Sequence, residues 1–284
     1  MDHESAASSK NPTPRLVSAE RENWNGMNSP RADTHALSPI LAVGPGRVGS
    51  ALARAAETAG VELKLVGRDE IQATAAEAEI VLLCVPDGEI TAAAEVVAGA
   101  STRLRLIGHT SGATELSALA AATAGGADAF SLHPLQTIPT GSTDLVGAPA
   151  AIEGSSEEAV GLSRDLAEAL GMRPFELPSG SRAAYHAAAS MASNFLIALE
   201  ESAAALLTDA GVGDAHELLA PLVLRTAANW AESGGGALTG PIARGDEATV
   251  DRHLAAIATT SPELDGLYRA LAERTRELAR ERVA

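Results

Sequence analysis

One stretch decides the fold of this 284-residue chain: ILAVGPGRVGSAL, residues 40–52. Its apolar start predicts a strand, its glycines a tight turn, and its Ala-rich end a helix that runs to Ala59-Gly60. In such a turn Gly44 permits the sharp bend, Gly46 leaves the backbone open to a pyrophosphate, and Gly49 lets the helix pack closely on the strand. The N–H groups at the helix start then point at phosphate. The alternative interpretation is a glycine turn with a purely structural role. We expect a dinucleotide to bind at Gly44, Pro45, Gly46, Arg47, Val48 and Gly49.

Further strand-like runs recur downstream at the spacing of βαβ units, separated in most cases by helical stretches. They are Val61–Val66, Ile80–Val85, Leu104–Gly108 and Ala127–Leu132, with Ala150–Glu153 and Arg173–Leu177 added around a helix at Glu157–Leu170. Strands joined by helices form right-handed crossovers and a parallel sheet covered on both faces. The expected fold class is therefore α/β, with a doubly wound parallel Rossmann sheet over residues 39–177.

Beyond residue 177 the sequence changes to Ala- and Leu-rich helical stretches. Ser181 is expected to cap one long helix that runs to Ala210 and stops at Gly211. Further helices fit residues 215–232, 246–256 and 262–283, so we expect an all-helical second domain over residues 178–284. Residues 1–38 are polar and have no apolar period, which predicts a disordered tail.

Composition excludes several classes of function. The formal net charge is −16 at pH 7 and aromatic residues make up 2%, so we expect no nucleic-acid partner. We expect neither a signal peptide nor a membrane segment, because no apolar run is long enough. The single cysteine, Cys84, excludes a disulfide framework and favours a reducing compartment, the cytoplasm.

The residues after the second strand bear on the choice between NAD and NADP. Where NAD-binding folds carry an acid for the ribose 2′-hydroxyl, this chain has Gly67, Arg68 and Asp69. Arg68 favours a 2′-phosphate and therefore NADP. Asp69 would serve NAD in a shifted register, so NAD is the less favoured alternative. Val85 and Pro86 end the third strand and are expected to border the cofactor, because ligands bind at the carboxyl ends of strands.

Two histidines follow the next two strands at equivalent places, in the segments His109-Thr110-Ser111-Gly112 and His133-Pro134-Leu135-Gln136. Two imidazoles that face one crevice indicate acid–base chemistry or anion binding. We expect His109, His133 and Ser111 to contact the substrate. The alternative is that each histidine caps its strand by a hydrogen bond to the backbone.

The predicted long helix carries a polar stripe. Ser190, Ser193, Asn194 and Glu201 lie four, seven, eight and fifteen residues after His186, which places them on one side of an α-helix. The serine and asparagine side chains of this stripe are short and polar, and the stripe includes no Lys or Arg. This favours a stripe that lines a water-filled cleft over one that faces bulk solvent. Ser190 is therefore expected to contact the substrate.

Lysine usage limits the choice of proton donor. The chain contains only two lysines, Lys10 in the tail and Lys64 in a strand. The donor in a hydride transfer would then be a histidine, tyrosine or serine, or a water that they hold. We expect His186 to be this donor.

The segment Thr239-Gly240-Pro241-Ile242-Ala243-Arg244-Gly245-Asp246 predicts a turn and a helix start with an arginine beside it. Such an arrangement can bind a carboxylate or a phosphate, so Thr239 and Arg244 are candidate anion ligands. The alternative is an ordinary connection between two helices with a solvent-exposed arginine. No metal site is expected, because the histidines lack the H-x-x-x-H and H-E-x-x-H spacings.

Together these motifs resemble one family, the proteins with a Rossmann-like domain followed by a helical C-terminal domain of unknown function. The resemblance covers residues 39–280 and is carried by the glycine turn, the two histidine segments, Tyr185-His186-Ala187-Ala188, Ser193-Asn194 and the Thr239–Asp246 segment. The family is distantly similar to pyrroline-5-carboxylate reductase, ketopantoate reductase and the 3-hydroxyacid dehydrogenases. These enzymes share the two-domain plan and usually dimerise through the helical domain, so the resemblance implies a homodimer.

The resemblance also implies roles for single residues. The two histidine segments would hold the nicotinamide end and the substrate, and Asn194 would match the asparagine that orients substrate on the long helix. The catalytic lysine of ketopantoate reductase and the 3-hydroxyacid dehydrogenases has no counterpart here, so their mechanism does not transfer directly. Some family members are similar to an alternative ketopantoate reductase, which serves pantothenate biosynthesis.

The expected function is an NADP-dependent oxidoreductase that reduces a small carbonyl or imine carboxylate. One alternative is a non-enzymatic module that senses or binds a dinucleotide, which predicts binding without turnover. The other is an NADP oxidoreductase that uses a flavin or deazaflavin, which would require space for a tricyclic ring beside the nicotinamide.

Overall fold

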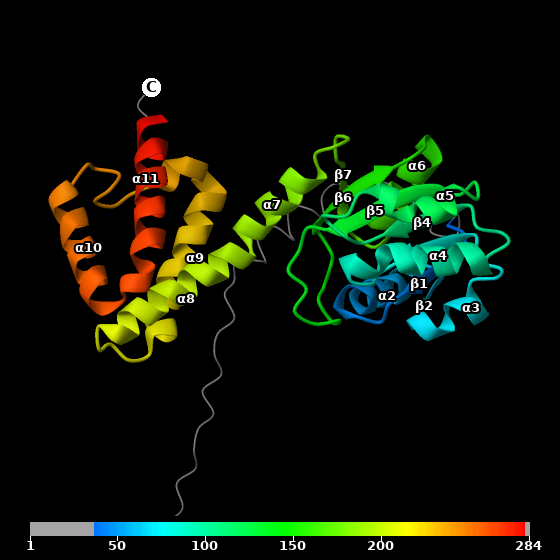
Figure 1. Ribbon diagram of the computed structural model, residues 1–284, viewed down its shortest axis with the longest axis horizontal. Helices are drawn as coiled ribbons and strands as arrows, with labels where there is room; N and C mark the ends of the chain where they lie inside the picture. Colours follow the sequence, from blue (N-terminus) through cyan, green and yellow to red (C-terminus); the bar gives the residue numbers. More distant parts are fainter. Residues whose placement is uncertain (1–36, 282–284) are drawn as a thin grey trace, which may run out of the picture. The chain divides into compact units, whose positions relative to one another are not determined.

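The computed structural model describes residues 37–281, and the chain divides into two compact units, one that ends at His186 and one that begins at Ala187 (Figure 1). The disordered tail predicted for residues 1–38 lies almost entirely outside the described residues. The sequence predicts a domain boundary after residue 177. In the structure the two units divide between His186 and Ala187, within helix α7 (Arg182–Ala192).

The first unit is built on one seven-stranded sheet with the order β2-β1-β3-β4-β5-β6-β7. Its strands are β1 (Ile40–Val43), β2 (Leu63–Val66), β3 (Ile80–Leu83), β4 (Leu106–His109), β5 (Asp128–Pro134), β6 (Pro149–Gly154) and β7 (Arg173–Glu176). The chain passes from β1 to β2 on one side and to β3 on the other, so the winding reverses between β1 and β3. In open α/β sheets, ligands bind outside the carboxyl ends of the strands at such a point.

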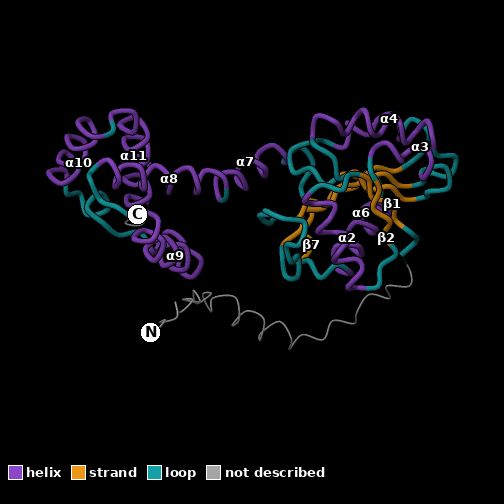
Figure 2. The backbone as a smooth tube through the Cα atoms, turned by 90° about the horizontal axis from the view of Figure 1, so that it is seen from below, coloured by secondary structure: helices purple, strands orange, loops and turns teal. Residues whose placement is uncertain are grey.

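Helices cover both faces of this sheet (Figure 2). On one face lie α2 (Arg47–Ala59) and α6 (Glu157–Ala169); on the other lie α3 (Ile71–Thr74), α4 (Ile90–Ala100) and α5 (Ala120–Thr123). Successive strand residues alternate between the two layers, as Leu82 packs in the α2 layer and Leu83 in the α4 layer. Burial on both faces explains why the central strands β1 and β3 are continuous apolar runs in the sequence.

The fold class predicted from the sequence is confirmed, because each predicted strand forms within two residues of its expected ends and the sheet is mostly parallel. The exception to the parallel arrangement is β6, which runs antiparallel to β5. Residues 135–148 join these two strands without a helix, so the chain folds back instead of crossing over the sheet.

After β7 the chain is helical. The helices are α7, α8 (Asn194–Asp209), α9 (Ala215–Ser233), α10 (Glu247–Thr260) and α11 (Asp265–Glu281). The single helix predicted from Ser181 to Ala210 is wrong, because the chain breaks at Ser193, whose φ of −122° and ψ of −77° are not helical. Ser181 also differs from the prediction, since its hydroxyl donates to the carbonyl oxygen of Pro178 at 2.6 Å. Gly211 follows the end of α8 with φ +85°, as expected of a helix stop.

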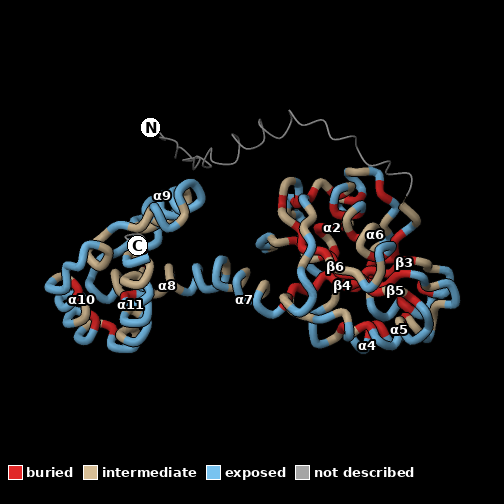
Figure 3. The backbone as a smooth tube through the Cα atoms, turned by 90° about the horizontal axis from the view of Figure 1, so that it is seen from above, coloured by how far each residue is buried: buried red, intermediate tan, exposed pale blue. Residues whose placement is uncertain are grey.

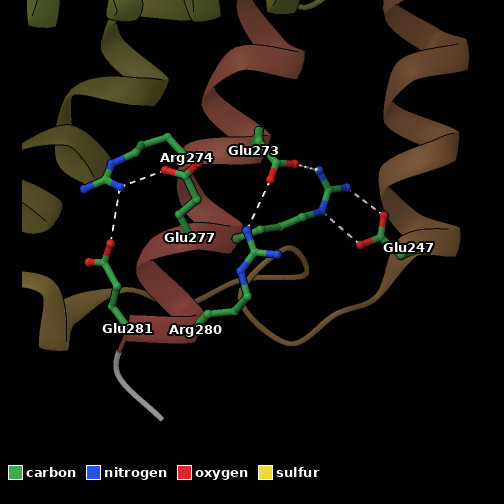
Figure 4. A network of polar contacts seen from close by, with 7 residues as sticks. Glu247, Glu273, Arg274, Glu277, Arg280 and Glu281 are labelled. Atoms are coloured by element: carbon green, nitrogen blue, oxygen red, sulfur yellow. Dashed lines mark hydrogen bonds and ion pairs between the residues drawn. The ribbon is translucent and has the colours of Figure 1, made fainter. Parts of the chain in front are cut away.

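Burial differs between the two units (Figure 3). In the described part of the second unit, the buried apolar residues are Ala204, Ala215, Val250, Ile257 and Ala272, and many larger apolar side chains are exposed. An ion pair links α10 to α11, since Arg276 of α11 binds Glu247 of α10 at 2.7 Å. Within α11, Glu273 also pairs with Arg276, at 3.5 Å, and Figure 4 shows the two glutamates of this network. Within residues 37–281, no helix combines the length and the apolar character needed to cross a membrane.

Candidate active site

The turn after β1 requires glycine at two positions. Gly44 has φ +112°, and a Cβ there would lie 2.6 Å from the carbonyl oxygen of Cys84. A Cβ at Gly49 would lie 2.1 Å from the carbonyl oxygen of Gly44. Both distances are too short for a Cβ atom. The close packing of this turn, α2 and β3 therefore requires glycine at both positions.

Gly46 lies at the N-cap of α2 and is different, because a Cβ there would have no atom within 4 Å. Pro45, Gly46 and Arg47 are exposed, whereas Val48 is partly buried and packs against the core. The first N–H groups of a helix have no intrahelical acceptor, and the helix dipole places positive potential there. The turn therefore leaves the backbone donors at the start of α2 open to a ligand, and the residues present fit the diphosphate of a dinucleotide.

Arg68 follows β2 and is half-exposed, with its guanidinium paired to the carboxylate of Glu89. Glu89 belongs to the turn after β3, so Arg68 lies beside the carboxyl end of that strand. The backbone N–H of Gly67 donates to the carboxylate of Glu70 at 2.7 Å. A 2′-phosphate at Arg68 would have to compete with Glu89.

The end of β3 meets the glycine turn, because a Cβ at Gly44 would lie 3.2 Å from Cγ1 of Val85. Val85 is half-buried and Pro86 is exposed. Burial raises the pKa of the Cys84 thiol to about 12, so this cysteine stays protonated and is not a nucleophile.

His109, the last residue of β4, is 0% exposed, and its ring nitrogens bind no other side chain among the described residues. Burial lowers its pKa to about 4, and the nearby Arg182 charge acts in the same direction, while Asp87 and the backbone of Glu115 oppose it. The sequence led us to expect this side chain to face an open crevice; in the structure it is fully buried at the end of β4. At neutral pH His109 is therefore an uncharged imidazole.

In the turn after β4, the serine hydroxyl forms hydrogen bonds within the turn itself. The hydroxyl of Ser111 accepts from the N–H of Thr114 at 2.9 Å and donates to the Thr114 hydroxyl at 2.9 Å. A Cβ at Gly112 would lie 2.8 Å from the rings of both His133 and His186. Gly112 therefore lets the backbone approach the two imidazoles.

His133, Tyr185 and His186 form one cluster. The phenolic oxygen of Tyr185 lies 2.6 Å from Nδ1 of His133. The rings of His133 and His186 meet edge to face, with centroids 6.2 Å apart. Burial lowers the pKa of His133 to about 4, and the charges of His186 and Arg182 act in the same direction. The structure thus brings together two of the predicted histidines and adds a tyrosine.

Arg182 is a residue that the sequence analysis missed. Its side chain is 1% exposed and binds three segments: it donates to the carboxylate of Glu153 on β6, to the carbonyl oxygen of Ser111 at 3.0 Å, and to the hydroxyl of Ser131 on β5. Because it is the first residue of α7, it fixes the start of this helix, and with it Tyr185 and His186, to the sheet.

The remaining predicted residues belong to the second unit. Ser190 lies in α7 and Asn194 begins α8, so the break at Ser193 separates them into different helices. Asn194 is exposed, and the Ser193 hydroxyl donates to its side-chain oxygen at 3.2 Å. The stripe predicted along one helix is therefore not continuous.

The segment from Thr239 to Asp246 forms the expected turn before α10. The carboxylate of Asp246 accepts from the N–H of Thr249 at 3.1 Å and caps the helix. Arg244 is exposed beside this cap. In the described residues, no group of three or more His, Cys, Asp or Glu side chains is arranged to hold a metal ion.

Two domain families match this chain. A Rossmann-like domain matches residues 66–134, and the domain of unknown function DUF2520 matches residues 148–275. The Rossmann-like match precedes the DUF2520 match along the chain. The resemblance drawn from the sequence motifs is thereby confirmed, and the DUF2520 match includes Glu153, Arg182 and Tyr185.

Solved structures share this fold. A protein of Bacteroides fragilis described as an NADP oxidoreductase has 23% identity and a TM-score of 0.70, covering 84% of this chain and 98% of its own. A pyrroline-5-carboxylate reductase of Coxiella burnetii has 13% identity and a TM-score of 0.53, with coverages of 86% and 98%. A reductive aminase of Aspergillus terreus, in complex with NADPH and ethyl levulinate, has 19% identity and a TM-score of 0.59, with coverages of 84% and 93%. At these identities the likeness is one of fold. No curated protein matches the chain.

Proposed function

We propose that this protein is an NADP-dependent reductase that acts on a small carbonyl or imine carboxylate. The observation that carries the proposal is the turn after β1, where Gly44 and Gly49 are fixed by close packing while Gly46 keeps open space at the start of α2. The likeness of fold to an NADP oxidoreductase and to an aminase in complex with NADPH supports it. Arg68 is the residue proposed to contact the 2′-phosphate, and Val85 and Pro86 would border the cofactor.

Bound NADPH would supply a hydride to the carbon of the C=O or C=N group. The chain itself would bind the diphosphate through the backbone of the glycine turn and orient the substrate at the carboxyl ends of β4 and β5. His133, His186 and Gly112 meet at that edge, and the turn ordered by Ser111 supports them. His109, which is fully buried at the end of β4, would contribute to the site as a neutral imidazole.

We infer a carboxylate substrate and take ketopantoate as its first candidate, which would place the protein in pantothenate biosynthesis. The proposal follows from the family resemblance. Thr239 and Arg244, with Ser190 and Asn194, are the proposed contacts of the second unit to an anionic substrate. We also propose a cytoplasmic location, because the single free cysteine, Cys84, is buried and fits a reducing compartment.

The reaction is tested with the purified protein and NADPH. NADPH binding is followed by its fluorescence, and its oxidation by loss of absorbance with ketopantoate first and then other keto and imino acids. Turnover with one of these acids is the expected result. A protein that binds NADPH but oxidises it with none of them would be a dinucleotide-binding module and not a reductase.

The variant Gly46→Val tests the cofactor turn in the same assay. A Cβ added at this exposed position meets no protein atom within 4 Å, so the variant should fold normally. It would block about two backbone hydrogen bonds to charged phosphate oxygens, each about 1.5 kcal/mol, and weaken NADPH binding about 100-fold. The control is Gly99→Val near the end of α4, where a Cβ also has open space. Equal NADPH affinity of the two variants would contradict phosphate binding at this turn.

We propose that the second unit forms a homodimer. Its described part buries few apolar residues, while Phe195 and Ile197 on α8 are each 62% exposed and Leu222 and Trp230 on α9 are also exposed. Exposed apolar surface of this kind marks an interface, and a second copy of the chain offers the same surface.

Sedimentation analysis of the whole chain tests the dimer. We expect twice the chain mass for the wild type and a monomer for Phe195→Asp, because a buried carboxylate would stay unpaired in the interface. Val146→Asp is the control, since Val146 is 64% exposed in the first unit. A monomeric wild type would contradict the dimer proposal.

A further inference from the structure

Tyr185 is held at the carboxyl end of β5. Its phenolic oxygen lies 2.6 Å from Nδ1 of His133, the next-to-last residue of that strand. The two rings meet edge to face with centroids 5.6 Å apart, and Phe175 of β7 also contacts the tyrosine ring at 6.0 Å. The ring is therefore packed against residues of two strands, and its hydroxyl is directed at His133.

The other candidate donors around this pair are less suited to give a proton. His109 is fully buried, and the Ser111 hydroxyl already donates to Thr114. His186 contacts the ring of His133 and makes no hydrogen bond to another described residue. Tyr185 is the one donor of this group that is paired with a residue able to return its proton.

We propose that Tyr185 is the catalytic acid of the reduction and that His133 orients its hydroxyl and restores its proton. This inference rests on the proposed function and deepens it. It also assigns to Tyr185 the part that the sequence led us to expect of its neighbour His186.

The proton transfer accompanies addition of a hydride to the carbonyl or imine carbon. The electron pair of the C=O or C=N bond moves to the oxygen or nitrogen, the O–H bond of Tyr185 breaks, and a new O–H or N–H bond forms there. The phenolate then takes the proton from Nδ1 of His133 while Nε2 takes one from water. The substrate gains one hydride and one proton, so it is reduced by two electrons and the nicotinamide is oxidised by two.

The protonation states in the structure suit this step. Burial raises the pKa of Tyr185 to about 12 and lowers that of His133 to about 4. At neutral pH the tyrosine is therefore protonated and the histidine neutral, with one ring N–H to donate. The alkoxide or amide anion that a hydride leaves behind is a stronger base than a phenolate, so the transfer is favourable even from this weak acid.

The chain offers a matched control for Tyr185. Its only other tyrosine, Tyr268, lies 2.7 Å from Nδ1 of His253 in the second unit, with ring centroids 5.9 Å apart. Tyr185→Phe and Tyr268→Phe thus remove the same hydroxyl from the same kind of pair. We expect kcat to fall by about 100-fold or more in Tyr185→Phe and to stay at the wild-type value in Tyr268→Phe, with NADPH affinity unchanged in both.

A pH profile separates loss of the acid from a structural defect. In Tyr185→Phe the proton must come from hydronium. The residual kcat of this variant should therefore rise about tenfold for each pH unit that the pH falls. The wild-type kcat should stay level between pH 6 and 8. A misplaced helix would instead lower the rate equally at every pH. If Tyr185→Phe does not bind NADPH, His133→Asn serves as the second variant, and its kcat should fall by about 10-fold or more with NADPH binding kept.

The outcomes separate this inference from the proposed function. Wild-type protein that binds NADPH but reduces no keto or imino acid overturns both. Wild-type turnover with a Tyr185→Phe variant that keeps most of its kcat overturns the inference alone. Loss of kcat in His186→Gln together with full activity in Tyr185→Phe would make His186 the donor and also overturn it.

Discussion

Replacing Arg182 with methionine is expected to lower the free energy of unfolding by about 3–5 kcal/mol. The guanidinium is 1% exposed and the Glu153 carboxylate that it binds is 17% exposed, so the variant leaves a largely buried negative charge without its partner. The same change removes the donors to the Ser111 carbonyl and the Ser131 hydroxyl. Chemical denaturation, followed by circular dichroism, measures the loss.

Arg164→Met is the control for this variant. Arg164 pairs with Glu176, but both side chains are well exposed, and such surface pairs contribute about 0–1 kcal/mol. The double variant Arg182→Met/Glu153→Gln should recover part of the loss, because it removes the unpaired charge. If Arg182→Met costs no more than Arg164→Met, the buried network does not fix α7 to the sheet.

The sequence predicted those parts of the fold that depend on a pattern within a short stretch of residues. The glycine turn is recognisable because Gly44 and Gly49 are fixed by contacts with residues close in the fold, and because a strand precedes it and a helix follows. The central strands β1 and β3 are recognisable because both of their faces are buried, which makes them apolar throughout. The break at Ser193 has a weaker signal, since neither glycine nor proline occurs there and only serine, a common N-cap residue, marks the start of α8.

The candidate site was predicted only in part, because its contacts join residues far apart in the sequence. His133 and Tyr185 are fifty-two residues apart, and no spacing rule pairs them. Arg182 was missed because arginine is rarely buried. One signal was available: Arg182 stands in the first turn of a helix, where the dipole disfavours a cation, so a partner elsewhere in the fold was to be expected.

Acid is expected to destabilise the first unit strongly between pH 6.5 and pH 4. Burial lowers the pKa values of His109 and His133 from 6.5 to about 4, so in this range the unfolded chain binds protons that the folded chain does not. The stability that these neutral histidines provide is complete above pH 6.5 and is lost as the pH falls through 4. At about 1.4 kcal/mol per pH unit, each histidine accounts for about 3 kcal/mol.

Together the two histidines would remove about 6 kcal/mol by pH 4, a loss comparable to the whole stability of many domains. Arg182 and Asp87 face His109 with opposite charges, and burial remains the larger effect. His109→Phe keeps a ring that does not titrate, so its unfolding free energy should fall about 3 kcal/mol less than that of the wild type over the same range. His216→Phe, at a side chain that is 76% exposed, should leave the wild-type acid loss unchanged. Equal acid losses in His109→Phe and the wild type would mean that His109 accepts its proton without unfolding, and that its buried ring finds an acceptor once charged.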